Sequence, residues 1–262
     1  MKKLPVGIQT FRKIIEYDCV YVDKTEHIYN LIKKASYYFL SRPRRFGKSL
    51  LLDTIGEVFI GDKELFKGLW IYESGFEFKK HPIIRVDMSN ISNETPEVLK
   101  KSILSHFRIC YEAEGLSMVD ETPSDAFRRL IIKLHEKYNE RVVVLIDEYD
   151  KPILDHMGDD DIADANRMVI RSFYGVLKSM DPHLRFTMFT GVSRFTKTSV
   201  FSELNNLTDI SLVEDYADIC GIPADSLEVH FAEHIANLRN YERFKHYNDI
   251  AEAILAWYDG YT

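Results

Sequence analysis

The hydrophobic pattern of the chain contains four short apolar runs, at residues 36–40 (SYYFL), 82–88 (PIIRVDM), 141–147 (RVVVLID) and 185–191 (RFTMFTG). Each run has the length and the β-branched or aromatic content that are typical of strands. Longer stretches of helical character separate the runs. This alternation predicts an α/β fold in which a mainly parallel sheet is connected by crossover helices.

Two amphipathic stretches fill the interval between the second and third runs, near residues 96–113 and 123–138. Each begins with a proline, Pro96 or Pro123, which is favoured in the first turn of a helix because its missing N–H group would have no partner there. We therefore expect two helices that pack on the sheet.

A further helix is predicted at residues 23–34, ahead of the first strand. There Asp23 precedes Glu26 by three residues, the spacing of a capping box, and apolar residues recur on one face of the segment.

After residue 214 the strand-like runs stop, and residues 225–244 and 247–261 have helical patterns. We therefore expect a core at residues 1–214, followed by a small helical, lid-like subdomain at residues 215–262.

The composition is that of a folded domain with an acidic surface. The chain has 262 residues, 45% of them hydrophobic, and a formal net charge of −7, so no global positive field favours nucleic acid, which would require a local patch or a partner. Three widely spaced cysteines, Cys19, Cys110 and Cys220, match neither a disulfide framework nor a metal motif. No apolar run suits a membrane span or a signal peptide, so we expect a cytoplasmic protein.

The first run is followed by SRPRRFGKSLLLDT at residues 41–54. A strand, a tight loop and a helix start are the parts of a phosphate-binding (Walker A) loop, in which Lys48 would reach the β- and γ-phosphates and the Ser49 hydroxyl would hold Mg²⁺. Arg42 stands where the pattern GxxxxGK[ST] has its first glycine, and Pro43 stiffens the next position. A basic surface turn is the alternative.

The third run ends in two carboxylates, as VVVLIDEYD. Five consecutive apolar residues predict a strand buried on both faces, whose carboxyl end would carry Asp147 and Glu148, as in a Walker B strand. Asp147 would anchor the Mg²⁺ hydration shell, and Glu148 would polarise the attacking water. The alternative is an acidic turn ahead of Pro152.

The fourth run ends as FTGVSRF, which places Thr190 and Ser193 at the same sheet edge, beside Asp147. Either could sense the γ-phosphate or the attacking water, although both residue types are also common in turns. Arg194 is a candidate charge stabiliser in the same chain or a neighbouring subunit, or a plain surface arginine.

A competing motif is HFAEH at residues 230–234, which matches the H-x-x-E-H pattern of inverted zinc proteases. His230 and His234 lie one helical turn apart with Glu233 beside them, and Glu242 or Glu252 could complete a metal site. An amphipathic helix explains the same residues without a metal.

The strings SRPRRFGKSLLLDT, VVVLIDEYDKPI and FTGVSRFTKTSVFSELNNLTDIS together resemble the bacterial AAA-ATPase-like family, which is related to STAND-type and archaeal ATPases. The opening residues 4–28 resemble the start of the same family. The resemblance implies a P-loop NTPase core of the additional-strand type, in which a sensor strand separates the phosphate-loop strand from the strand of Asp147. It also implies that the segment 1–35 contacts the base.

In such a site the ATP contacts would come from the loop and the first turn of its helix, and Ile8, Phe11 or Tyr21 could line an adenine pocket. The loop residues expected to bind ATP are Arg44, Arg45, Phe46, Gly47, Lys48, Ser49 and Leu50. The charge of Arg44 and Arg45 could instead contact a partner domain that closes over the site.

The resemblance further implies a longer protein, because members of the family often carry a PD-(D/E)XK nuclease-like domain after the ATPase. We therefore expect an Mg²⁺-dependent ATP-binding module that hydrolyses ATP, and that works with a downstream effector domain or by self-association. The alternatives are a nucleotide switch without hydrolysis and a phosphotransferase that acts on a small molecule.

Overall fold

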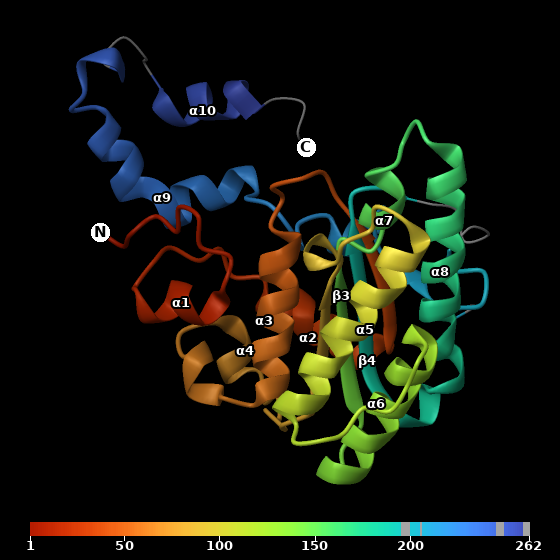
Figure 1. Cartoon of the computed structure of the whole chain (residues 1–262). Helices are drawn as coiled ribbons and strands as arrows, with labels where there is room; N and C mark the ends of the chain where they lie inside the picture. Colours follow the sequence, from red (N-terminus) through yellow and green to blue (C-terminus); the bar gives the residue numbers. More distant parts are fainter. Residues whose placement is uncertain (195–199, 205, 245–248, 259–262) are drawn as a thin grey trace.

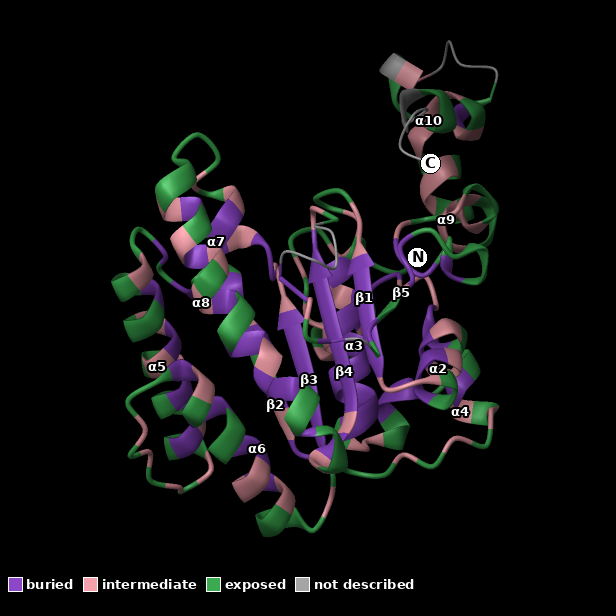
Figure 2. Ribbon diagram, turned by 90° about the vertical axis from the view of Figure 1, so that its right-hand side faces the viewer, coloured by how far each residue is buried: buried purple, intermediate pink, exposed green. Residues whose placement is uncertain are grey.

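A computed structural model describes residues 1–194, 200–204, 206–244 and 249–258. Five parallel strands form one sheet in the spatial order β2-β3-β4-β1-β5 (Figure 2). The strands are β1 (Tyr37–Ser41), β2 (Ile83–Asp87), β3 (Val142–Asp147), β4 (Leu184–Gly191) and β5 (Thr208–Asp209). Because β4 lies between β1 and β3, the sheet has the additional-strand arrangement expected for a P-loop NTPase core.

Helices connect and cover these strands (Figure 1). The α-helices are α1 (Phe11–Glu16), α2 (Thr25–Lys34), α3 (Lys48–Ile60), α4 (Trp70–Glu73), α5 (Pro96–Ala113), α6 (Pro123–Tyr138), α7 (Lys151–Leu154), α8 (Asp160–Ser179), α9 (Ala224–Leu238) and α10 (Ile250–Tyr258). Short 3₁₀ turns occur at Lys63–Phe66, Met88–Asn90, Asp181–His183, Glu214–Tyr216 and Glu242–Phe244. No helix of the described residues is long and apolar enough to cross a membrane.

The two faces of the sheet bury alternate residues of each strand, which is the period of a strand. In β3, Val142, Val144 and Ile146 pack into one cluster with α5, α6 and α8. Val143 and Leu145 pack into the other cluster, with α2, α3 and the N-terminal region. The run of apolar residues in β3 is therefore explained by burial on both faces, as the sequence predicted.

The four predicted strands and the helices at 96–113 and 123–138 are confirmed, with Pro96 and Pro123 at the starts of α5 and α6. The predicted capping box at Asp23 is wrong, because α2 begins at Thr25 with Lys24 at the N-cap position. The Asp23 carboxylate instead accepts hydrogen bonds from the amides of Thr25 (2.8 Å) and Trp70 (2.7 Å), so it joins α2 to α4.

The strand β5 was not predicted, because a two-residue strand has no apolar pattern of its own. It pairs with β1 at the edge of the sheet, where Thr208 is opposite Tyr38 and Asp209 is opposite Phe39. Its position depends on tertiary contacts, and it brings the chain back to the end of the phosphate-loop strand.

The two C-terminal helices form where the pattern predicted them. α9 has no fully buried residue in its described span, and it lies near the chain's N-terminus (Figure 1), where the amino group of Met1 pairs with Glu233 at 3.2 Å. Ile250, at the start of α10, is buried. The division into a core at 1–214 and a helical subdomain at 215–262 stays a prediction.

Candidate functional site

The candidate site lies at the carboxyl end of the sheet, where the chain leaves β1, turns through residues 42–47 and enters α3. Gly47 has a left-handed backbone conformation (φ 85°) at the N-cap position of α3, and Arg45 has φ 71°. A side chain at Gly47 would meet nothing within 4 Å, so the space above the helix start is open. The loop therefore makes its left-handed turns at Arg45 and Gly47, not at Arg42.

The start of α3 differs from those of the other long core helices. α5, α6 and α8 each have a side-chain oxygen at the N-cap that accepts a hydrogen bond from a first-turn amide, from Thr95, Thr122 and Asp159 respectively. α3 has neither a side-chain cap from Gly47 nor an acidic residue in its first turn within the described chain. Its first amides are therefore free to bind an anion, which the helix dipole also favours.

Lys48 is the first residue of α3, and its side chain folds back along the loop. Its amine donates hydrogen bonds to the carbonyl oxygens of Arg42 and Pro43, each at 3.0 Å. Burial lowers the pKa of Lys48, and the carboxylates of Asp147 and Glu148 oppose that shift. A buried cation that lies beside two carboxylates and donates to two loop carbonyls is suited to exchange those carbonyls for phosphate oxygens.

Arg42, the residue that replaces the expected glycine, braces the loop. Its guanidinium donates to the carbonyl oxygens of Ser211 and Tyr216, and its amide donates to the carbonyl of Gly191 (3.2 Å). On the far side of the loop, the amide of Gly221 donates to the carbonyl of Phe46 (2.9 Å). Contacts with the segment after β5 thus hold a loop that lacks the first glycine of the common pattern.

The acidic end of β3 lies next to the end of β4, as expected. The Thr190 hydroxyl donates a hydrogen bond to the Asp147 carboxylate, which also accepts the amide of Glu148 at 3.0 Å. Asp87, at the end of β2, is opposite Asp147 in the sheet register. Burial raises the pKa of Glu148, and the charges of Asp147 and Asp87 add to that effect. Glu148 also has a left-handed backbone (φ 50°).

A second acidic residue, Asp150, joins the end of β3 to the loop after β4. Its side chain is buried, and one carboxylate oxygen accepts the amides of Val192 (3.0 Å) and Ser193 (2.5 Å). The Tyr149 hydroxyl donates to the carbonyl of Ser193 at 3.0 Å. Any side chain at Gly191 would lie 2.5 Å from the Tyr149 ring, so the close approach of these segments requires glycine there.

The predicted polar residues after β4 occupy different positions. Thr190 contacts Asp147 directly, whereas the backbone of Ser193 is held by Asp150 and Tyr149. Arg194 is exposed and its Nε donates to Asp209 of β5 at 2.7 Å. In this arrangement the guanidinium of Arg194 is paired with a carboxylate at the edge of the sheet.

The remaining loop residues surround the helix start. Arg44 and Arg45 are exposed, and Ser49 and Leu50 are half-buried. Ser49 is therefore accessible in the first turn of α3, as a metal-binding hydroxyl must be.

The expected Mg²⁺ set fits the donors that the structure presents. The described residues contain no group of three His, Cys, Asp or Glu side chains arranged to hold a metal ion. Mg²⁺ in phosphate sites takes only one or two protein ligands and completes its shell with phosphate and water. A hydroxyl from Ser49 and a carboxylate from Asp147 would be such a set.

The zinc-protease alternative gains no support, because the described residues contain no group of three His, Cys, Asp or Glu side chains placed to hold a metal ion. Glu233 pairs with the amino group of Met1, and the Nδ1 atom of His234 is buried. His230 and His234 lie on α9, whose apolar residues Leu227 and Phe231 are half-buried.

Two of the suggested adenine-contacting residues pack against other aromatic rings. Phe11 is fully buried and stacks on Phe66 with the ring centres 4.9 Å apart. Tyr21 makes an edge contact with Phe11 at 5.0 Å. Phe11 is therefore core, whereas Ile8 is half-buried.

Several residues of the site were missed by sequence reasoning. Asp150 and Tyr149 follow the two expected carboxylates in DEYD, a clue that the sequence did offer. Cys220, whose pKa is raised to about 11 by burial, lies near Arg42 and Lys48. Its thiol is therefore neutral at pH 7. No local sequence pattern predicts the position of Cys220 in the site, because it is about 170 residues further along the chain than the phosphate loop.

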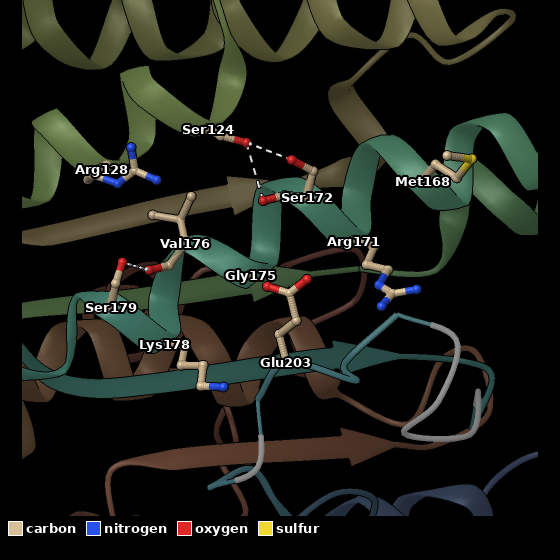
Figure 3. Close-up of a pocket in the computed structure, with 10 residues that line it drawn as sticks. All are labelled: Ser124, Arg128, Met168, Arg171, Ser172, Gly175, Val176, Lys178, Ser179 and Glu203. Carbon is tan, nitrogen blue, oxygen red and sulfur yellow. Dashed lines mark hydrogen bonds between the residues drawn. The ribbon is translucent and has the colours of Figure 1, made fainter.

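The structure also contains two large cavities away from the phosphate loop. One, of about 840 Å³, lies between α6 and α8 (Figure 3). Arg128, Arg171 and Lys178 line it, and the Glu203 carboxylate approaches the backbone of α8 at Gly175, where a side chain would meet it at 2.5 Å. The other, of about 770 Å³, lies at the amino end of the sheet.

Comparison with solved structures gives distant matches. A DNA replication initiation factor is 10% identical, with a TM-score of 0.38, over 98% of this chain and 64% of that chain. The Drosophila ORC structure bound to GC-rich DNA and Cdc6 is 9% identical, with a TM-score of 0.37, over 96% of this chain and 38% of that chain.

Sequence comparison is more informative. The chain is 42% identical over all of its 262 residues to an Azotobacter chroococcum mcd 1 protein described as "Uncharacterized protein in vnfD 5'region". It spans 49% of that relative's length. Residues 5–201, which include the phosphate loop and the strands β1 to β4, match the family model described as "Predicted AAA-ATPase". The chain therefore belongs to the AAA-ATPase-like family.

Proposed function

We propose that this chain binds ATP with Mg²⁺ at the carboxyl end of the sheet and hydrolyses it as a nucleotide-driven switch or motor. The observation that carries the proposal is the start of α3, where an uncapped helix, open space above Gly47 and the Lys48 amine converge. Family membership supports nucleotide binding independently. We assign metal binding, water activation and sensing of the γ-phosphate to side chains of this chain.

Binding would exchange the loop carbonyls around Lys48 for phosphate oxygens. The first-turn amides of α3 would bind the same phosphates, with Ser49 and Asp147 holding the metal. When bound, Mg²⁺ neutralises charge on the phosphate oxygens. Asp147 is already oriented by the Thr190 hydroxyl and by the amide of Glu148.

Hydrolysis needs a group that orients and deprotonates water. Glu148 follows Asp147, is partly exposed, and has a raised pKa, which brings a carboxylate closer to the working range of a general base. Thr190, beside Asp147, is suited to sense the γ-phosphate, and Asp150 would transmit that state to the loop at Ser193. Water is the proposed acceptor, in preference to a small-molecule alcohol, because Glu148 adjoins the metal-binding carboxylate.

The direct test is ATP binding by Lys48→Ala, measured by isothermal titration with and without Mg²⁺. We expect the variant to lose at least about 2 kcal/mol of binding free energy, because a charge-assisted contact in a partly desolvated site is removed. The matched control is Lys137→Ala, since Lys137 lies on α6, away from the loop, and pairs with Glu114 at the end of α5. Equal affinity in Lys48→Ala and the parent would refute the phosphate-loop assignment.

A non-hydrolysing switch is the second candidate, favoured by the pairing of Arg194 with Asp209 in the same chain. P-loop proteins that lack a charge-stabilising arginine in place can turn over about 10⁵-fold below the assisted rate. We therefore expect slow hydrolysis by residues 1–262 alone that rises with protein concentration or in a longer chain. Fast turnover independent of both would identify a self-sufficient ATPase.

A further inference from the structure

The second cavity, of about 770 Å³, is lined by residues at the starts of the parallel strands. This end of the sheet is opposite to the phosphate loop (Figure 2). Its walls come from α2, from the connection between α4 and β2, and from the ends of elements that flank β3 and β4. No ATP-binding residue of the proposed site lines it.

Three basic residues reach this cavity from the starts of three neighbouring strands. His81 lies two residues before the start of β2, with Pro82 between them. Arg141 immediately precedes β3, and Arg185 is the second residue of β4. Since β2, β3 and β4 are adjacent and parallel, their starts meet at one edge of the sheet. The topology therefore concentrates like charges that are far apart in the sequence.

Arg185 is half-buried and has no carboxylate partner among the described residues. Its guanidinium lies over the Phe59 ring, with 5.8 Å to the ring centre, and donates to the Ile32 carbonyl at 3.5 Å. Burial lowers its pKa, and Arg141 adds to that shift through charge repulsion. A buried guanidinium without an anionic partner is costly, and a stacking contact offsets only part of that cost.

The acidic residues of the cavity do not balance its bases. Glu140 pairs with Lys79 at 2.6 Å and lies 3.7 Å from the Nδ1 atom of His81. The other lining carboxylate, Glu77, is exposed. With Lys33, the lining therefore carries four permanent cations and two carboxylates, an excess of two positive charges before any histidine is protonated.

We propose that this cavity binds the dianionic oxyanion group of a small molecule, either a phosphate monoester or a dicarboxylate, through Arg141 and Arg185. A guanidinium presents paired N–H donors that match the spacing of phosphate and carboxylate oxygens. The two excess charges match those of a dianion. The His81 ring already hydrogen-bonds the Arg141 carbonyl through Nδ1 (2.9 Å), which fixes the backbone that carries one of the arginines.

The cavity between α6 and α8 is a weaker candidate, although it too has three cations. There the Glu203 carboxylate reaches toward α8 at Gly175, between the positions of Arg171 and Lys178 (Figure 3). An anionic ligand would meet an anion of the chain itself. We therefore take the matched control variant, Arg171→Gln, from this cavity.

The test is independent of the proposed ATPase function, because it is made in the Lys48→Ala background, where the phosphate loop is impaired. Inorganic phosphate and succinate are titrated separately, up to about 10 mM, against the full 262-residue chain by calorimetry. We expect at least one of them to bind. Adding Arg185→Gln or Arg141→Gln is expected to weaken that binding about tenfold or more, because a charge-assisted pair is lost.

The control is Arg171→Gln in the same background, which is expected to bind like its parent. Circular dichroism checks folding, and Arg141→Gln decides the matter if Arg185→Gln does not fold, since Arg141 is exposed. Binding of phosphate but not succinate would favour a phosphate-bearing ligand, and binding of succinate but not phosphate a dicarboxylate. Binding of both would support a general dianion site. The proposal is overturned if neither probe binds, if both cavity variants bind normally, or if Arg171→Gln loses as much affinity.

Discussion

The two ends of the sheet use the same strands for opposite charges. At the carboxyl end, β2 finishes at Asp87 and β3 at Asp147, with Glu148 directly after it. At the amino end, the same strands are preceded by His81 and Arg141. The strand interiors are apolar and pack on both faces, so the chemistry of each end depends on the one or two residues where a strand starts or stops.

The two ends differ in how far their charged side chains are paired with polar or oppositely charged groups. At the carboxyl end the carboxylates are hydrogen-bonded by neighbouring residues, as Asp147 is by Thr190 and Asp150 by the amides of Val192 and Ser193. At the amino end, Arg185 lacks an anionic partner within the described chain. In our proposals, the first end performs a reaction with a bound metal and the second end holds an anion.

The largest expected effect is a loss of ATP hydrolysis when the acidic end of the sheet is changed. Glu148→Gln is expected to retain ATP but to slow hydrolysis by roughly 100-fold, because the amide cannot accept a proton from water. Steady-state turnover and ATP titration of the same preparation separate the two effects. Glu136→Gln, on the exposed face of α6, is the control. Hydrolysis by Glu148→Gln at the parental rate would show that another group activates the water.

Asp147 gives a companion test of the metal assignment. Asp147→Asn is expected to reduce the Mg²⁺-dependent part of ATP binding by roughly tenfold, because one anionic ligand is lost. Titrations with and without Mg²⁺ measure that part directly. If Asp147→Asn, like Glu148→Gln, lost turnover but kept its Mg²⁺-dependent ATP binding, Asp147 would act in the chemical step and not as a metal ligand.

Much of the carboxyl end was predictable from the sequence, because its elements carry strong local signals. Five apolar residues ahead of Asp147 define a doubly buried strand, and Gly47 and Lys48 mark the start of α3. The position of β4 between β1 and β3 was expected from family resemblance, and residue patterns alone do not give a strand order.

What could not be predicted depends on contacts between distant segments. Arg42 departs from the phosphate-loop pattern in the sequence, but in the fold its guanidinium donates to the carbonyls of Ser211 and Tyr216 and so braces the loop. The convergence of Arg141 and Arg185 likewise follows only from the order of the strands. Asp23 shows a different case. Its spacing to Glu26 matches a capping box, but its carboxylate accepts the amide of Trp70 instead.

A smaller effect is expected where the two carboxyl-end loops are joined. Asp150→Asn is expected to lower the free energy of unfolding by about 2 kcal/mol, because a side-chain amide is a weaker acceptor than the carboxylate for the two backbone amides. We expect this loss to exceed the relief from burying a charge, which raises the pKa of Asp150. Denaturant unfolding measures the change. Asp215→Asn, whose side chain is 69% exposed in its pair with Lys34, is the control and should unfold like the parent. A similar stability for Asp150→Asn would mean that the β4 loop is held by other contacts.

The smallest expected effect is a pH-dependent change in thermal stability at the carboxyl end. The folded-state pKa of Glu148 lies above its ordinary value of 4.5, because of burial and of repulsion by Asp147 and Asp87. The ionised carboxylate therefore opposes folding at neutral pH, and this penalty disappears as the pH falls through the raised pKa and the group binds a proton.

Glu148→Gln, which has no charge to lose, should thus melt on the order of 2 °C above the parent at pH 8, and the difference should shrink toward pH 4. Thermal melts of both proteins across this range, without nucleotide, make the measurement. A gap that stays constant with pH would assign the stability change to packing of the amide. A lower melting temperature for the variant at pH 8 would show that contacts at the carboxyl end stabilise the Glu148 carboxylate.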